Sequence, residues 1–283
     1  MWYVYMLMHL VGLVGYSLLL RKSLIAKADK WAQATIMQTA IAVPILLAAL
    51  VIRPDLGSFN IHQWFLAILI AIFTILLHWT NVMAVARLEA GTYSILYNTR
   101  LFFVTILGIV FLGEKIVPLQ LLGGVLIFLA VFVVRQRGPK HLTRTGLAWG
   151  LMAALTISIL NIFEKKLVLQ VGFFKDMLAV SLLATPVMWA MLFARGGRIP
   201  FSYLKQRETI IFMVLRAISA YGFILAFSVG LLSVTSYISG LSVVVIMILG
   251  ALWLDERDHP REKIVATTLA AVGLTVILLS KII

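Results

Sequence analysis

Two arginines fall inside long apolar stretches and are the residues best suited to binding chemistry. Arg100 and Arg216 each lie well within a predicted membrane-crossing helix. An arginine at the bilayer centre costs about 2.5–3.5 kcal/mol to insert, so its side chain must face a partner, water or a ligand. A guanidinium binds a carboxylate or phosphate through two parallel hydrogen bonds. We therefore predict that both arginines line a substrate cavity and that Arg100 is the anchor for an anionic substrate group. The alternative is that Arg100 bonds carbonyl groups of a neighbouring helix and Arg216 extends to the nearer interface.

No carboxyl group is expected deep in the membrane to neutralise these arginines. The acidic residues nearest the predicted helices are assigned to helix ends or loops: Glu89, Glu114, Glu164, Asp176, Glu208, Asp255 and Glu256. Glu114 and Glu256 are interpreted as caps of the helices that follow them, because negative charge is favourable at a helix N-terminus. The missing negative charge is therefore predicted to come from the substrate.

Aromatic residues share a helix face with Arg100. Tyr93, Tyr97 and Arg100 are spaced at i, i+4 and i+7, which places them on one side of a helix. Two aromatic rings beside a guanidinium suit an amphipathic organic anion. The alternative is ordinary packing, with Tyr93 in the aromatic belt at the membrane surface.

Polar stripes on two further helices point to the same cavity. Thr74, His78 and Asn81 have the spacing of one helix face, and so do His9 and Tyr16. A polar stripe in a membrane helix faces protein or a cavity. A histidine there can relay a proton, bond a substrate, or act as a neutral donor that fixes a helix contact.

Two smaller polar patches complete the predicted cavity. Asn161 lies near Ser158, and Ser239 belongs to a run of small residues that suits either close helix packing or a cavity wall. The predicted cavity residues are Arg100, Tyr97, Tyr93, His78, Asn81, Arg216, His9, Tyr16, Asn161 and Ser239. No catalytic residue, metal ligand or cofactor is expected, because the sequence has no cysteine, phosphate loop, catalytic triad or paired carboxylates.

The elements that position these residues are membrane helices. The 283 residues are 62% hydrophobic and 12% charged, whereas a soluble domain is about half apolar and a quarter charged. A helix of roughly 20 apolar residues spans a bilayer. Ten such spans are predicted: 2–20, 32–52, 62–86, 91–112, 117–135, 145–163, 176–194, 209–230, 234–254 and 262–281. The net charge of +13 falls mainly in short loops, so lipid headgroups are the expected partner of these charges and nucleic acid is not.

An internal repeat organises the spans. Ile106-Leu107-Gly108 returns 142 residues later as Ile248-Leu249-Gly250, and the prolines Pro44 and Pro186 lie inside predicted helices at the same offset. An odd number of spans in each copy inverts the second copy relative to the first. We predict an all-α membrane protein of ten transmembrane helices, built as two inverted five-helix repeats around a central cavity. The repeats cover 1–137 and 145–283, and 138–144 is a basic linker.

The repeated segments resemble the EamA family of the drug/metabolite transporter superfamily. The resemblance is carried by residues 106–114 with Pro118 in the first copy, and by Leu254-Asp255-Glu256 with Pro260 in the second. It implies a carrier of small organic solutes, with helices one, three, four, six, eight and nine around the cavity and helices five and ten at the periphery. The family often has a proline midway along helices four and nine, whereas 98–101 and 240–243 contain none.

Loop charge predicts the orientation of the chain. Lysine and arginine concentrate in the loops expected on the side opposite the N-terminus, including the stretch 135–144. The positive-inside rule then places both termini outside the cytoplasm, in the plasma (inner) membrane. The family is generally drawn with both termini in the cytoplasm, so the charge pattern departs from the resemblance.

Together these features predict a secondary-active transporter of a small organic anion or zwitterion that works by alternating access. Export is the commoner direction in the family, and protons are a candidate coupling ion. The first alternative is a proton-coupled exporter of lipophilic cations, which needs a membrane carboxylate. Further alternatives are a lipid flippase and a non-transporting membrane scaffold. The protein is expected to be a monomer or a homodimer.

Overall fold

The computed structural model describes residues 1–112, 118–137, 143–230, 232–256 and 260–279. Within these ranges the regular elements are all α-helices. The predicted cap Glu114 and most of the predicted linker, 138–142, lie outside the described residues.

The helices of the two halves have matching bounds. The first half contains α1 (Trp2–Ile25), α2 (Lys30–Ile52), α3 (Ile61–Val85), α4 (Ala90–Tyr97), α5 (Arg100–Leu112) and α6 (Pro118–Arg137). The second half contains α7 (Arg144–Val171), α8 (Phe173–Ala194), α9 (Phe201–Leu204), α10 (Arg207–Val229), α11 (Leu232–Gly240), α12 (Ser242–Trp253) and α13 (Pro260–Leu279). Apart from the short α9, each helix of the second half has a counterpart about 142 residues earlier. This recurrence supports the two-repeat arrangement, which stays a prediction.

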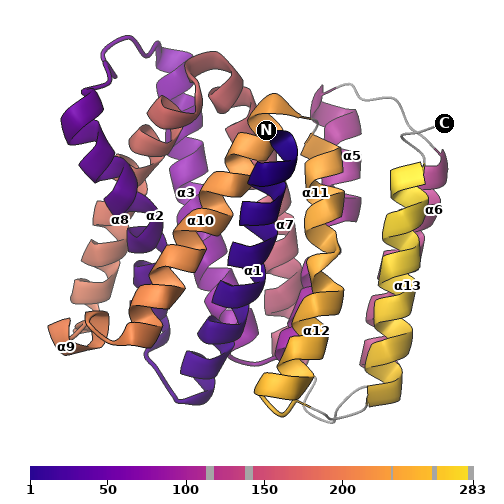
Figure 1. The fold of residues 1–283 in the computed structure, drawn as a ribbon. Coiled ribbons are helices and arrows are strands. Elements are labelled where there is room, and N and C mark those ends of the chain that lie inside the picture. Colours follow the sequence, from indigo (N-terminus) through magenta and orange to yellow (C-terminus); the bar gives the residue numbers. More distant parts are fainter. Residues whose placement is uncertain (113–117, 138–142, 231, 257–259, 280–283) are drawn as a thin grey trace.

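Six of these helices have the dimensions of membrane spans. By length and composition α1, α2, α3, α7, α8 and α10 can each cross a bilayer. Pro44 and Pro186 lie inside α2 and α8, as the sequence predicted. In Figure 1 α2 and α8 stand at one edge of the bundle and α6 and α13 at the other, with α1, α3, α7 and α10 between them.

Two predicted spans are broken rather than continuous. The span 91–112 divides into α4 and α5 at Asn98 and Thr99, and the span 234–254 divides into α11 and α12 at Leu241. The Asn98 side-chain amide donates to the carbonyl oxygen of Gly240 at 3.0 Å, and so joins the two breaks. A break frees backbone groups that must be bonded again within the bundle. The prediction of a single helix over each of these two spans was therefore wrong.

Glycine allows α1 and α10 to pack very closely. A Cβ atom at Gly12 would lie 2.5 Å from the carbonyl oxygen of Leu215, and one at Gly222 would lie 2.6 Å from that of Tyr5. No real side chain fits at such distances, so these two positions require glycine. Small residues at a membrane helix interface permit this approach, and here it brings the polar stripe of α1 against α10.

Candidate functional site

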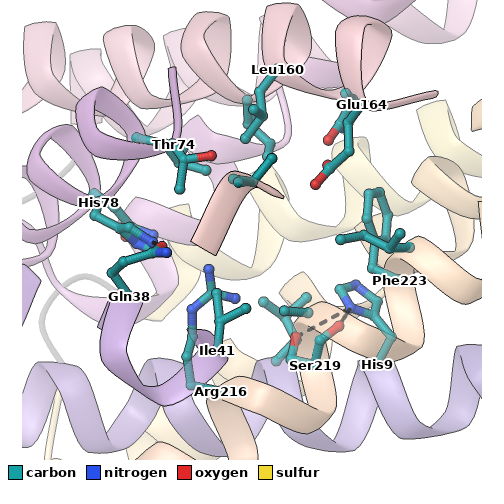
Figure 2. A pocket seen from close by; sticks show the side chains of 18 of the residues that line it. His9, Gln38, Ile41, Thr74, His78, Leu160, Glu164, Arg216, Ser219 and Phe223 are labelled. Carbon is teal, nitrogen blue, oxygen red and sulfur yellow. Dashed lines mark hydrogen bonds between the residues drawn. The ribbon is translucent and has the colours of Figure 1, made fainter. Parts of the chain in front are cut away.

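The polar residues of the bundle converge on one cavity of about 90 Å³. Residues of α1, α2, α3, α7, α8 and α10 line it, together with Tyr97 at the end of α4 and Arg100 at the start of α5. Figure 2 shows several of these side chains directed toward the common space. The predicted residues on its wall are His9, Tyr16, His78, Asn81, Tyr97, Arg100, Asn161 and Arg216.

Two predicted residues lie beside this cavity and not on its wall. Tyr93 lines a separate pocket of about 20 Å³, which also contacts Tyr97 and Tyr16. Ser239 is completely buried and bonds residues that do line the main cavity. The structure thus brings the predicted set together, while a role in substrate binding stays a prediction for each residue.

Arg216 projects into the cavity from the middle of α10 (Figure 2). Its guanidinium carbon lies 5.0 Å from the centre of the Tyr16 ring. Its Nε is buried without a hydrogen-bond partner, and the guanidinium makes no hydrogen bond to any residue within the described ranges. Arg216 thus lines the cavity, and its binding of an anionic group stays a prediction. The side chain presents its donors to the cavity.

Arg100 is held by the protein more firmly. It is 3% exposed, its Nη2 donates to the Ser239 hydroxyl at 2.7 Å, and its guanidinium carbon lies 4.8 Å from the centre of the Tyr97 ring. Its Nε has no hydrogen-bond partner. The hydrogen-bond partner from the neighbouring helix is thus a hydroxyl of α11, where the sequence suggested a backbone carbonyl.

His9 extends the contact of Arg100. Its Nδ1 lies 2.9 Å from the carbonyl oxygen of Ser219 and its Nε2 lies 2.7 Å from the Ser239 hydroxyl. A carbonyl oxygen only accepts, so Nδ1 carries the proton and donates to it. The Ser239 hydroxyl accepts from Arg100 and uses its single hydrogen to donate to Nε2. This pattern is satisfied by a neutral imidazole, which makes His9 a positioning residue for Arg100.

His78 is oriented by a side chain that sequence reasoning missed. Its Nε2 lies 3.0 Å from Oε1 of Gln38, and the Gln38 amide nitrogen donates to the Thr185 hydroxyl at 3.2 Å. Nδ1 of His78 is buried and has no hydrogen-bond partner. Because Nε2 donates to the glutamine oxygen, Nδ1 of the neutral ring is free to accept a hydrogen bond.

Two carboxyl groups are buried where none was expected. Glu164 lies inside α7, is 6% exposed, and lines the cavity, where Figure 2 shows it across from Arg216. Asp176 in the first turn of α8 is fully buried, and among the described residues neither of its carboxyl oxygens has a hydrogen-bond partner. The predicted helix ended at residue 163, but α7 continues to Val171. The signal was the apolar pair Leu167 and Val168, both buried, which follows the charged residues.

An ion pair joins the two halves at one end of the bundle. Arg21 Nε donates to Glu256 at 2.7 Å and Arg21 Nη1 donates to the carbonyl of Val85 at 2.8 Å. The second oxygen of Glu256 accepts from the backbone N–H of Ala90 at 2.7 Å, so the carboxylate bonds the start of α4, whereas the sequence assigned it to the helix that follows it. Burial raises the pKa of Glu256 above its ordinary value, although the bonds from Arg21 and Ala90 oppose that rise.

The opposite end of the bundle has a related contact without a described acidic partner. Lys165 of α7 donates to the carbonyl oxygens of Phe227 and Gly230 near the C-terminal end of α10, the latter at 2.9 Å. Phe227 lies 142 residues after Val85, which accepts from Arg21. Arg21 of α1 and Lys165 of α7 therefore each bond carbonyl groups at the C-terminal ends of α3 and α10, respectively. The helix dipole favours positive charge at these ends.

Comparison with known proteins identifies the first half. The sequence profile of the EamA-like transporter family matches residues 1–136. Residues 1–136 belong to the EamA-like transporter family. No curated protein sequence matches the chain. The match to a family of transporters, together with six apolar helices long enough to cross a bilayer, supports a multi-pass membrane protein.

The fold of the EamA-like chain also has a solved counterpart. A structure described as "Crystal structure of protein" aligns with 97% of this chain and 97% of its own, with a TM-score of 0.66 and 14% sequence identity. At that identity the likeness concerns the fold alone. It spans both halves of the chain, whereas the family profile covers the first.

Proposed function

We propose that the protein is a secondary-active carrier of a small organic anion or zwitterion, which binds in the central cavity and crosses by alternating access. The observation that supports this most is the Arg216 guanidinium, directed into a buried cavity without a hydrogen bond from the described residues. A guanidinium that faces a cavity with its Nε buried and unbonded favours a group of opposite charge in that cavity. A carboxylate or phosphate group on a substrate supplies the partner.

The balance of charge in the cavity favours a negatively charged ligand. Two guanidinium groups, Arg100 and Arg216, line it together with one carboxyl group, that of Glu164. Positive charge is therefore in excess even when Glu164 is ionised. A zwitterion fits the same cavity, because Glu164 faces Arg216 across it and accepts from an ammonium group.

The helix breaks and the end contacts support alternating access. Discontinuous helices near the centre of a membrane protein are typical of carriers that rock around a midplane site. The α4/α5 break lies beside Arg100, and Asn98 joins it to the α11/α12 break. The ion pair Arg21–Glu256 would have to separate when that end opens. Export is the proposed direction.

The charge pattern supports an orientation with both termini outside the cytoplasm of the plasma (inner) membrane. The protein has no cysteine, so a single introduced thiol reports its own location. Tyr3→Cys, at a position that is 81% exposed, should react with a membrane-impermeant maleimide on intact cells. Labelling only after the cells are lysed would place the N-terminus in the cytoplasm and contradict the proposed orientation.

A second candidate is a proton-coupled exporter of lipophilic cations. This class needs a membrane carboxylate for which proton and cation compete, and Glu164 provides one in the cavity. It ranks second because Arg100 and Arg216 repel a cation in the same space.

A ligand screen on the purified protein tests the proposal. Thermal shifts are compared for anions, zwitterions and cations, since a ligand that binds the folded state raises its stability. Anions or zwitterions should stabilise the wild type and lose this effect in Arg216→Gln. Arg207→Gln, at the exposed start of the same helix, is the matched control and should respond as the wild type does. Stabilisation by cations alone, unaffected by Arg216→Gln, would replace the proposal with the second candidate.

A further inference from the structure

One wall of the cavity carries buried polar atoms that the protein leaves without partners. Asn161 of α7 is 0% exposed, and neither its amide nitrogen nor its amide oxygen has a hydrogen bond to the residues that the structure describes. Ser181 of α8 is 1% exposed, and its hydroxyl also has no hydrogen-bond partner in the described part of the chain. Both side chains line the cavity. Buried polar groups are normally hydrogen-bonded, so each exception calls for an explanation.

A neighbouring serine shows that this is not the ordinary behaviour of the bundle. Ser158 lies one turn before Asn161 on α7, and its hydroxyl lies 2.6 Å from the carbonyl of Ala154 and 3.0 Å from that of Arg100. A serine in an apolar helix usually donates to the carbonyl four residues earlier in this way. Ser181 does not, although it sits inside a regular helix. Its hydroxyl is therefore left for a group that enters the cavity.

We propose that Asn161 and Ser181 form a neutral hydrogen-bonding subsite for a hydroxyl group of the substrate, and that the substrate class is small hydroxylated organic anions. This inference rests on the proposed function, because the anionic group is bound by Arg216 on α10 while the hydroxyl is bound by α7 and α8. Nδ1 of His78, buried on α3 without a partner, adds one more acceptor on the same cavity wall.

The types of the unpartnered atoms select a hydroxyl over an ammonium group. The amide of Asn161 offers both a donor and an acceptor, and the Ser181 hydroxyl offers the same. A substrate hydroxyl both donates and accepts, so it can bond a donor and an acceptor of the subsite at once. An ammonium group only donates, and it would leave the Asn161 nitrogen unpaired. A site built to bond a hydroxyl discriminates strongly against an analogue that lacks it, because its buried groups then stay unpaired.

Three probes with one carbon skeleton test the subsite. Lactate, alanine and propionate share a carboxylate and differ at one carbon, which bears a hydroxyl, an ammonium or hydrogen. Binding to the purified wild-type protein is measured by isothermal titration calorimetry. We expect lactate to bind at least about tenfold more tightly than propionate and also more tightly than alanine. Equal binding of lactate and propionate would overturn the subsite, and tightest binding of alanine would replace it with an ammonium site at Glu164.

Variants then locate the preference. Asn161→Leu and Ser181→Ala should each reduce the lactate-to-propionate ratio toward one while propionate binding stays within about threefold. Ser158→Ala is the matched control, because its hydroxyl already has protein partners, and it should keep the ratio. A ratio that survives both subsite variants contradicts the assignment, and the wild-type comparison decides it if a variant fails to fold.

The failure of this inference is distinct from that of the proposed function. If all three probes bind with similar affinity and their binding is lost in Arg216→Gln, the proposed anion carrier is supported and the hydroxyl subsite is contradicted. If none of the three binds, or if binding survives Arg216→Gln, the anion site itself is wrong and the subsite falls with it.

Discussion

Arg100 and Arg216 line one cavity, yet their surroundings assign them different work. Arg100 starts α5 at a helix break, bonds Ser239 and packs on Tyr97. Arg216 sits in an unbroken helix and makes no hydrogen bond to the part of the chain that the structure describes. Both are equally unusual in an apolar sequence. These contacts therefore distinguish Arg100, which links helices, from Arg216, which is available to bind a ligand.

The largest effect is expected for Arg216→Gln. Removing one partner of a buried charge pair costs about 2–5 kcal/mol of binding, so affinity for an anionic substrate should fall by roughly 100-fold. The free energy of unfolding should change little, because Arg216 makes no hydrogen bond to the described residues and the variant loses only its contact with the Tyr16 ring. Calorimetry and thermal melts of the same preparation measure the two. A large loss of stability would make Arg216 structural and erase the contrast with Arg100.

Arg100→Gln should show the opposite division. The charged hydrogen bond to Ser239 and the contact with Tyr97 are lost, and stability should fall by about 2 kcal/mol. Substrate affinity should change less than for Arg216→Gln. Arg100→Lys keeps the charge on a side chain without the planar fork, and stability should be restored only in part. If affinity falls more than stability, Arg100 is the main anion site, as the sequence suggested.

Ser239→Ala sharpens the comparison because it removes the link and keeps both cations. The Arg100 Nη2 donor and the His9 Nε2 acceptor each lose a partner, so stability should fall by about 1 kcal/mol. The effect should be nearly absent in the Arg100→Gln background, where that donor has already gone. A double-mutant cycle measured by thermal melts gives this coupling. Additive effects would show that Ser239 does not hold Arg100.

The smallest effects are expected at the membrane surface. Arg21→Gln breaks a pair with Glu256 whose side chains are 15% and 8% exposed, and it should cost about 1 kcal/mol. Lys22→Gln breaks the exposed pair with Glu208 and should have no measurable effect on the melting temperature. A fall in stability after Lys22→Gln as large as that after Arg100→Gln would show that partner number, not burial, decides the cost.

Helical spacing was sufficient to predict much of the cavity. Thr74, His78 and Asn81 were placed on one face by the 3.6-residue period, and all three line the cavity. Glu164 was missed because the charged residues 164–166 suggest the end of a membrane span. The helix α7 in fact continues beyond them to Val171. Gln38 was missed because its role depends on His78, which is distant in sequence. Residue spacing predicts which side chains share a helix face, but it does not predict which residues of other helices they contact.

The bond from Asn98 to Gly240 has a consequence for the resting state of a carrier. The two residues occupy equivalent places in the two halves, but only asparagine has a side chain that can donate. If the halves exchange conformations during a cycle, the corresponding bond from position 240 to position 98 cannot form, since glycine has no side-chain amide. The inward-facing and outward-facing forms are then unequal in energy before any substrate arrives, and the empty protein has a built-in preference for one side of the membrane.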